Sequence, residues 1–359
     1  MIAYCTNVHP APDLAGILAQ LDRYAVRVRE ALEADTLPLG LWLPAPVARG
    51  LAEDGTARQH FRAELASRGL TVSTLNAFPY GDFHDEVVKH AVYFPTWTDP
   101  RRLQYTVDCA NVLADLLPDS ASYGSISTLP LAWREPWTGR DDDRAADALA
   151  ELTPSLRRHG RPIRLAVEPE PGCVLDTVAD TVGWLAGRVD PEYIGICLDT
   201  CHLAVSFADP AETVASIRAA GLDVVKVQAS AALEVAEPGT AAGRRAIAGY
   251  SEPRYLHQVR ENTPGGVLAA DDLPEALETL PAEHPWRVHF HVPLHAVPPA
   301  PLTSTTDVLV AAVAAVDPGT HVEVETYTWT VLPGAGDLAD GIAAELRWAA
   351  QHLRTGVAV

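Results

Sequence analysis

The sequence predicts a (β/α)8 barrel, also called a TIM barrel, on three observations. Short apolar runs alternate with segments of helical spacing along nearly the whole chain. The apolar runs give eight strands, and polar residues directly follow several of them. Such alternation gives a parallel sheet, and eight strands close it into a barrel whose ligands bind at the carboxyl ends of the strands. A chain of 359 residues can form such a barrel as one domain, so we expect 1–359 to be a single TIM-barrel domain.

Each expected strand is short and rich in Val, Ile and Leu, as buried parallel strands are. The eight strands are expected at residues Ile2–Thr6, Leu39–Leu43, Thr71–Phe78, Gly124–Leu129, Ile163–Val167, Ile194–Asp199, Val224–Val227 and Val322–Glu325.

The helices are expected where apolar residues recur every three or four positions. Leu14, Ile17 and Leu21 show this spacing, and Pro100 stands at a preferred first helical position. The expected helices are Asp13–Ala34, Pro46–Arg68, Pro100–Leu117, Asp141–Arg158, Thr177–Arg188, Ala211–Ala220 and Asp337–Leu353. An eighth helical region is expected in the long segment before the last strand.

One apolar segment does not fit the count of eight. Arg287–Val292, RVHFHV, follows an irregular stretch that is too long for a plain connection. We interpret about 231–300 as an insertion over the barrel mouth, near the last strands, with RVHFHV as its inner strand. The alternative is that RVHFHV is a barrel strand and that one of the other eight is not.

Composition excludes several classes of partner. The formal net charge is −20, which would repel nucleic-acid phosphates and anionic membranes. No apolar run approaches a membrane span, and the N-terminal segment does not look like a signal peptide. The five cysteines include no CxxC pair, which suits a reducing cytosol, so we expect a cytoplasmic protein that does not insert in membranes.

Four oxygen-bearing side chains lie at the ends of predicted strands late in the barrel. They are Glu168, Asp199, Gln228 and Glu325. Strand ends converge in a barrel, and hard divalent cations prefer carboxylate and amide oxygens. We therefore predict a divalent-metal site, with Glu170 and Glu323 as fallback ligands because they share a face with Glu168 and Glu325.

Two glutamates beside a cation can also move protons. One carboxylate can take a proton from a carbon next to a carbonyl, and the other can return it to the neighbouring carbon. This chemistry serves ketose–aldose isomerisation and 3-epimerisation. We therefore predict Glu168 and Glu325 as the catalytic pair, with His202 positioned to hold a substrate oxygen.

The motifs LAVEPEPG, CLDTCH, VKVQAS and VEVE resemble those of the xylose isomerase-like TIM barrels. The resemblance implies a divalent metal held by Glu168, Asp199, Gln228 and Glu325. It also implies an acid–base role for the two glutamates and a substrate contact for His202. The chain departs from that pattern because Ala229–Glu234 contains no arginine, which those enzymes use to bind substrate oxygens.

A second resemblance covers nearly the whole chain. YCTNVHP, SISTLP, YLHQV, VHFHVPLH and VETYTW are similar to motifs of the EboE family, described as metabolite traffic proteins of the Ebo gene cluster. The cluster also encodes a UbiA-type prenyltransferase. The resemblance implies a small secondary-metabolite substrate and other Ebo-cluster proteins as partners.

Further polar residues are expected to line the barrel mouth. The expected substrate-binding residues are Asn7, His9, Asn76, Tyr80, His84, Glu170, Lys226 and His289. His291 is an additional candidate metal ligand, which would favour Zn, Mn or Fe over Mg. Four tryptophans could form an aromatic wall or could pack a lid: Trp97, Trp133, Trp137 and Trp329.

Three functions remain open on the sequence. The first is a metal-dependent isomerase or epimerase of a sugar-like compound. The second is a metal-dependent lyase or hydrolase acting on a cyclised or prenylated intermediate. The third is a non-catalytic metabolite-binding protein. We expect a small-molecule partner and a monomer or dimer.

Overall fold

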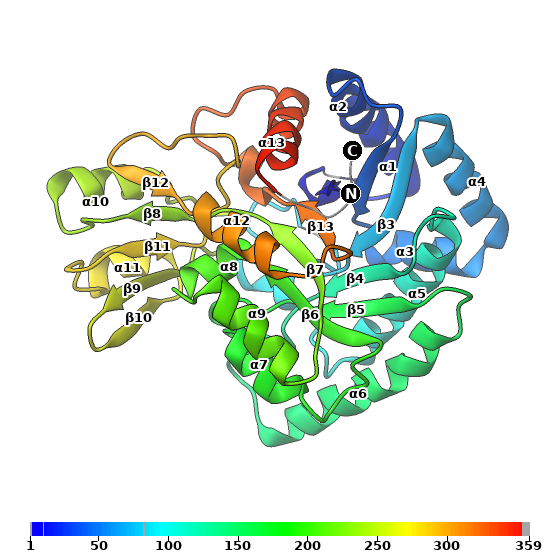
Figure 1. The fold of residues 1–359 in the computed structure, drawn as a ribbon, viewed down its shortest axis with the longest axis horizontal. Helices are drawn as coiled ribbons and strands as arrows, with labels where there is room; N and C mark the ends of the chain where they lie inside the picture. Colours follow the sequence, from blue (N-terminus) through cyan, green and yellow to red (C-terminus); the bar gives the residue numbers. More distant parts are fainter. Residues whose placement is uncertain (1, 10, 82, 354–359) are drawn as a thin grey trace.

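The computed structural model describes residues 2–9, 11–81 and 83–353. Eight parallel strands form a closed barrel in the order β1-β13-β7-β6-β5-β4-β3-β2. This confirms the predicted (β/α)8 barrel (Figure 1). The barrel strands are β1 (Ile2–Cys5), β2 (Leu37–Leu41), β3 (Leu70–Asn76), β4 (Gly124–Thr128), β5 (Ile163–Val167), β6 (Ile194–Asp199), β7 (Val224–Ala229) and β13 (His321–Val324).

Helices surround the barrel and cover its apolar outer face (Figure 1). They are α1 (Leu14–Gln20), a π-helical turn (Leu21–Ala25), α2 (Val26–Ala31), α3 (Ala45–Glu53), α4 (Gly55–Ser67), α5 (Pro100–Leu116), α6 (Gly139–Arg157), α7 (Val178–Leu185), α8 (Thr200–Val205), α9 (Pro210–Ala219), α12 (Thr306–Ala315) and α13 (Leu338–His352). Helix α12 supplies the helical region that was expected before the last strand.

The helix predicted over Pro46–Arg68 is two helices. The Asp54 backbone is extended, which ends α3, and its side chain accepts hydrogen bonds from the backbone N–H groups of Thr56 and Ala57. Aspartate is a preferred N-cap residue, so Asp54 both stops one helix and begins the next.

A second sheet of five strands lies beside the barrel, at the left in Figure 1, in the order β10-β9-β11-β8-β12. Its elements are β8 (Leu233–Val235), α10 (Ala241–Ala248), β9 (Val259–Thr263), β10 (Gly266–Ala270), α11 (Leu273–Thr279), β11 (Trp286–Val288) and β12 (Leu302–Ser304). Side chains of the sheet, α10 and α11 share a separate apolar core around Trp286 and Phe290.

The segment RVHFHV belongs to this second sheet, so the alternative that it is a barrel strand is wrong. Only its first part is strand, as β11 pairs with β8 and β9 and ends at Val288. His289 and His291 follow in extended connecting chain. That the whole chain is one domain, with about 231–300 as an insertion, remains a proposal.

The register between neighbouring strands determines how far along the barrel axis each polar side chain lies. Gln228 on β7 pairs with Asp199 on β6 and with Glu323 on β13. Side chains alternate along a strand, so Glu325 stands one step further towards the barrel mouth than Glu323. Glu323 is fully buried and forms an ion pair of 2.7 Å with Lys226. The barrel interior therefore carries a buried ion pair beneath the level of Glu325.

Candidate metal centre

Three carboxylates meet at the barrel mouth. Glu168, Asp199 and Glu325 each place an oxygen within 4.8 Å of the others, and all three side chains are buried. Glu168 directly follows β5, Asp199 ends β6 and Glu325 directly follows β13. The convergence of strand ends therefore brings together three residues that are far apart in the sequence.

Asp199 is held by one oxygen and leaves the other free. Its Oδ1 accepts hydrogen bonds from the backbone N–H of His202, at 2.9 Å, and from the hydroxyl of Ser230, at 2.8 Å. Its Oδ2 is buried and has no hydrogen-bond partner among the described residues. The side-chain orientation is thus fixed before any ligand binds.

Gln228 and His291 present further buried atoms without partners. Neither side-chain atom of Gln228 has a hydrogen-bond partner in the described part of the chain. His291 Nδ1 lies 2.9 Å from the backbone carbonyl of Glu325, so Nδ1 carries the hydrogen and Nε2 carries a lone pair. That Nε2 is also unpartnered and lies 3.9 Å from Asp199 Oδ2.

Buried polar atoms without partners are costly and rare, so their concentration here calls for a bound group. Carboxylate oxygens, an amide oxygen and a neutral imidazole nitrogen together suit a divalent cation. The residues present therefore fit the metal that the sequence predicts, with Glu168, Asp199, Gln228, His291 and Glu325 as the candidate ligands.

The electrostatics of these residues agree with this fit. Burial, together with the charges of Asp199 and Glu323, raises the pKa of Glu325 to about 8. Burial and the charges of Glu325 and Asp199 raise the pKa of Glu168 well above its ordinary value. Burial lowers the pKa of His291 to about 4, which keeps its ring neutral. Metal ligands are deprotonated carboxylates and neutral imidazoles, so a bound cation would replace the protons that the raised pKa values favour on the two glutamates.

Two asparagines orient Glu325. The Nδ2 groups of Asn7 and Asn76 both donate to Glu325 Oε1, at 2.5 Å and 2.9 Å. Both residues also line the cavity described next, where they were predicted to bind substrate. Their hydrogen bonds leave Oε2 of Glu325 available for a cation or a proton.

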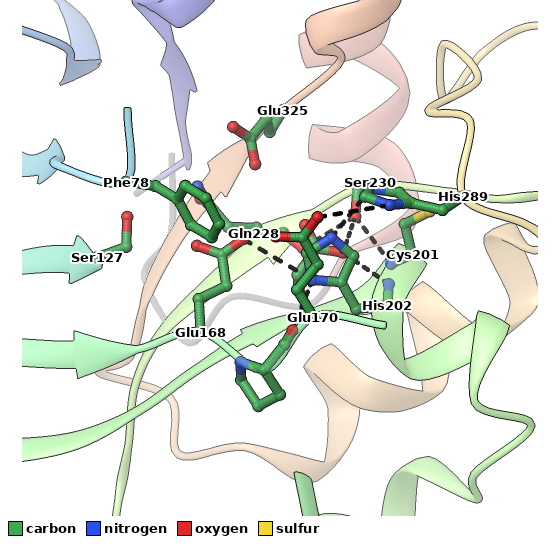
Figure 2. A network of polar contacts seen from close by, with 12 residues as sticks. Phe78, Ser127, Glu168, Glu170, Cys201, His202, Gln228, Ser230, His289 and Glu325 are labelled. Atoms are coloured by element: carbon green, nitrogen blue, oxygen red, sulfur yellow. Dashed lines mark hydrogen bonds and ion pairs between the residues drawn. The ribbon is translucent and has the colours of Figure 1, made fainter. Parts of the chain in front are cut away.

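A cavity of about 70 Å³ opens above these carboxylates. Its floor includes Glu168, Glu170 and Glu325, which lie around a common space in Figure 2. Its walls are mainly aromatic and apolar: Phe78, Pro79, Phe83, Val88, Val92, Tyr93, Tyr255, Leu256 and Tyr327. The four tryptophans do not line this cavity, so the aromatic wall consists of tyrosine and phenylalanine.

The model of the xylose isomerase-like TIM barrel family matches residues 28–251, more than half of the chain. The chain belongs to the xylose isomerase-like TIM barrel family. No curated protein sequence matches it significantly.

Solved structures agree with this family fold. A xylose isomerase-like TIM barrel protein from Mycobacterium smegmatis in complex with magnesium is 15% identical, with a TM-score of 0.53, over 98% of this chain and 97% of the other. The IOLI protein with a bound zinc atom is 12% identical, with a TM-score of 0.53, over 100% and 99% of the two chains. A D-psicose 3-epimerase in the presence of D-fructose is 13% identical, with a TM-score of 0.53, over 98% and 99%. At these identities the likeness shows the fold.

Beside the candidate ligands, this xylose isomerase-like barrel has a second polar group formed by Glu170, His202 and His289. One ligand atom from each lies within 4.8 Å of the others, and all three are buried. Figure 2 shows His202 and His289 approaching one another next to Glu170. His289 comes from the chain that follows β11, so the second sheet contributes to the barrel mouth.

Four predicted site residues lie away from this cavity. His9 stacks on Tyr24, with ring centroids 4.6 Å apart. Tyr80 and His84 line a different surface pocket. Lys226 is fully buried below the site, where its Nζ contacts Glu323, the Ser127 hydroxyl and the Leu75 carbonyl. Their roles as substrate contacts therefore find no support in the geometry.

Three functional residues were missed by the sequence reasoning. Ser230 orients Asp199, while Tyr93 and Gln258 both contact Glu170, at 2.6 Å and 3.4 Å. Ser230 and Gln258 stand inside the quoted motifs VKVQAS and YLHQV, which could have pointed to them. Their roles depend on contacts between distant segments, which no spacing rule reveals.

No described helix combines the length and apolar character needed to cross a bilayer.

Proposed function

We propose that this protein is a divalent-metal-dependent isomerase or epimerase that acts on a small, neutral, sugar-like substrate. The observation that carries the proposal is the pair Glu168 and Glu325. Both are buried, both face the same cavity, and both have raised pKa values. One such carboxylate can take a proton from a carbon, and a proton can then be returned to the neighbouring carbon in an isomerisation or by the other carboxylate to the opposite face of the same carbon in an epimerisation.

Each residue of the site has a distinct role in this proposal. Asn7 and Asn76 hold one oxygen of Glu325, so its other oxygen is directed to ligand or substrate. Asp199, Gln228 and His291 would hold the cation with the two glutamates. A bound divalent cation would stabilise negative charge that develops on substrate oxygens during proton transfer. The apolar walls exclude water from the carbon that loses its proton.

The cavity favours a neutral substrate. Among its described lining residues, Lys89 is the only lysine or arginine, and its ammonium already forms an ion pair with Asp272. A phosphate group would therefore meet carboxylates rather than free cationic groups. The volume of about 70 Å³ supports a small compound over a prenylated one.

We also propose that the protein is of the EboE type. Support comes from the motifs YLHQV and VHFHVPLH, which provide Gln258, His289 and His291 to the barrel mouth. On this proposal the substrate is a small secondary metabolite, the protein acts in the cytoplasm, and other Ebo-cluster proteins are its partners. The aromatic walls favour a substrate with an apolar edge, which keeps a metal-dependent lyase as the second candidate.

The first experiment is metal analysis of the purified protein by inductively coupled plasma mass spectrometry, before and after chelation. We expect bound Mn, Zn, Fe or Mg in the wild type and a sharp loss in Asp199→Asn. The matched control is Asp317→Asn, since Asp317 is exposed and its carboxylate pairs with Arg218 at the surface rather than with any candidate ligand. Full metal occupancy in folded Asp199→Asn would overturn the cation assignment.

The second experiment tests proton transfer directly. The metal-loaded protein is incubated with a panel of neutral ketoses in D2O, and exchange of carbon-bound hydrogen is followed by NMR. We expect exchange with the wild type and none with Glu168→Gln. Metal binding without hydrogen exchange on any compound would contradict the isomerase proposal and favour a non-catalytic metabolite-binding function.

A further inference from the structure

Lysine is rare in this protein, and one of its lysines faces the candidate active site. The sequence contains only Lys89 and Lys226. Lys226 is fully buried below the carboxylates. Lys89 belongs to the connection between β3 and α5, lines the cavity and has 26% of its side chain exposed. It is therefore the one ammonium that a ligand in the cavity can reach.

The backbone of Lys89 is held in an unfavourable conformation. Its φ is +38°, in the left-handed region that residues other than glycine rarely adopt. The N–H groups of Val88 and Lys89 both donate to the Arg254 carbonyl, at 2.8 Å and 2.9 Å, and so hold this conformation. Backbone strain that the surrounding structure maintains in this way is concentrated at ligand-binding and catalytic sites.

The ion pair of Lys89 with Asp272 leaves part of the ammonium free. Asp272 uses its other oxygen to accept hydrogen bonds from the backbone N–H groups of His257 and Leu273, at 3.1 Å and 2.9 Å, so the carboxylate is fixed. In the described part of the chain Lys89 Nζ has no partner besides Asp272. An ammonium carries three hydrogens, so two remain for a ligand.

The other polar groups of the cavity are mainly acceptors. Three tyrosine hydroxyls each donate to an oxygen of the protein. They are those of Tyr93, Tyr255 and Tyr327. Three histidines each direct Nδ1 at an oxygen of the protein, which leaves a lone pair on Nε2. They are His202, His289 and His291. The amides of Asn7 and Asn76 donate to Glu325.

A sugar-like substrate brings several carbonyl and hydroxyl oxygens that accept hydrogen bonds. The proposed cation can bind those close to the carboxylates, whereas the others need donors from the protein. Hydrogen bonds from a charged donor are about twice as strong as those from a neutral one. Since Ala229–Glu234 contains no arginine, Lys89 is placed to supply this donor from another connection of the barrel.

A purely structural role is the competing explanation, and a neighbouring ion pair serves to test it. Arg134 pairs with Asp271, the residue beside Asp272, and so joins the connection between β4 and α6 to the same turn after β10. Arg134 is not among the residues that line the cavity. It makes a similar tie between barrel and second sheet without facing a ligand.

We propose that Lys89 is a substrate-binding residue, which donates to a hydroxyl or carbonyl oxygen of the substrate while it stays paired with Asp272. Because Asp272 balances its charge, the pair selects a neutral oxygen rather than a phosphate. The substrate class is thus a neutral polyol or ketose with an oxygen beyond those that the cation binds. This inference rests on the proposed function.

The first test observes Lys89 directly. Protein grown with isotope-labelled lysine is loaded with Mg²⁺ and titrated with D-fructose, D-ribulose and L-sorbose in NMR experiments. The signals of Lys89 are identified by their absence in Lys89→Arg. We expect them to shift in a saturable way with at least one of the ketoses. Arg134→Gln is the matched control and should keep the shift.

The second test compares variants in the D2O exchange assay with the same ketoses. We expect Lys89→Met to raise the ketose concentration for half-maximal exchange about 10- to 100-fold, as loss of a hydrogen bond from a charged donor does. Arg134→Gln should match the wild type. Circular dichroism confirms the fold of each variant.

The outcomes separate this inference from the proposed function. Exchange by the wild type without a shift of the Lys89 signals overturns the role of Lys89 and leaves the proposed function, even where Lys89→Met fails to fold. An unchanged half-maximal concentration in folded Lys89→Met has the same meaning. A saturable shift of Lys89 without exchange supports its binding role and overturns the isomerase reaction. Neither shift nor exchange with any ketose overturns both.

Discussion

The amide of Asn76 donates a hydrogen bond of 2.9 Å to the Oε1 of Glu325, across 249 residues of sequence. Asn76 ends β3 and Glu325 follows β13, so the bond joins two strand ends across the barrel mouth. Asn7 donates to the same oxygen. The glutamate that we propose for metal binding and proton transfer is thus oriented by residues that need not touch the cation.

This relationship predicts the effect of Asn76→Ala. Removing one of two donors lets the Glu325 carboxylate rotate, and loss of such supporting contacts costs metal sites about 10- to 100-fold in affinity. We expect a weaker Mn²⁺ dissociation constant by this order, measured by isothermal titration calorimetry. Asn262→Ala, on the second sheet, is the matched control. Unchanged affinity in folded Asn76→Ala would show that Asn7 alone orients Glu325.

The ion pair between Lys226 and Glu323 predicts a large loss of stability in Lys226→Met. Both side chains have no exposed surface, so removal of the ammonium leaves a buried carboxylate without its partner. Breaking a buried pair in this way costs roughly 3–5 kcal/mol. We expect this decrease in the free energy of unfolding, measured by urea denaturation.

The double variant Lys226→Met/Glu323→Gln checks the cause of that loss. It removes both charges, so it should recover part of the stability that Lys226→Met loses. A double variant that is less stable than the single one would show that packing of the lysine stem, rather than charge, dominates.

Cysteine reactivity gives a third prediction. Cys5, Cys109, Cys173, Cys197 and Cys201 are all free thiols and all buried. Burial raises the pKa of the Cys197 and Cys201 thiols well above the ordinary value, which suppresses the reactive thiolate. We expect less than about one rapidly reacting thiol per chain with Ellman's reagent in the native protein. Five should react after denaturation. Rapid reaction of several thiols in the native state would contradict the burial of these residues.

The barrel could be predicted because each strand carries its own signal. Runs such as Ile163–Val167 are apolar throughout, and the closure of eight such strands brings Glu168, Asp199 and Glu325 together whatever the detailed packing. The second sheet could not be predicted in this way. Its strands β8, β11 and β12 have three residues each, which is too short to reveal the alternation of apolar and polar residues that marks a strand.

The arrangement of His202 and His289 could not be predicted from the sequence for a related reason. Their hydrogen positions are fixed by Pro169 and Gln258, which come from other segments of the chain. Sequence spacing could nominate the histidines but could not show which ring nitrogen carries a lone pair. Only the placement of Gln258 against Pro171 and Glu170 settles that point.

Glu345 on α13 predicts a pH dependence of stability. It accepts hydrogen bonds from the Leu294 backbone, the Thr326 hydroxyl and the Trp329 indole, and so joins α13 to two loops at the barrel mouth. Burial raises the pKa of Glu345 from 4.5 to about 7. The folded state therefore holds this proton more tightly than the unfolded state.

The sign of the effect follows from proton linkage. Between pH 4.5 and about 7 the folded state binds a proton that the unfolded state has lost, so the free energy of unfolding falls as the pH rises. The loss is complete above the folded pKa and is on the order of 3 kcal/mol, at about 1.4 kcal/mol per pKa unit. Glu345→Gln cannot ionise and escapes this loss.

We therefore expect the stability of Glu345→Gln relative to the wild type to increase by about 2–3 kcal/mol between pH 5 and pH 8, by the same linkage. Urea denaturation at saturating Mn²⁺ measures it while keeping the metal ligands in one state. The exposed Glu278→Gln should show no such trend. A difference between Glu345→Gln and wild type that does not change with pH would mean that Glu345 keeps its charge in the folded protein, stabilised by its three donors.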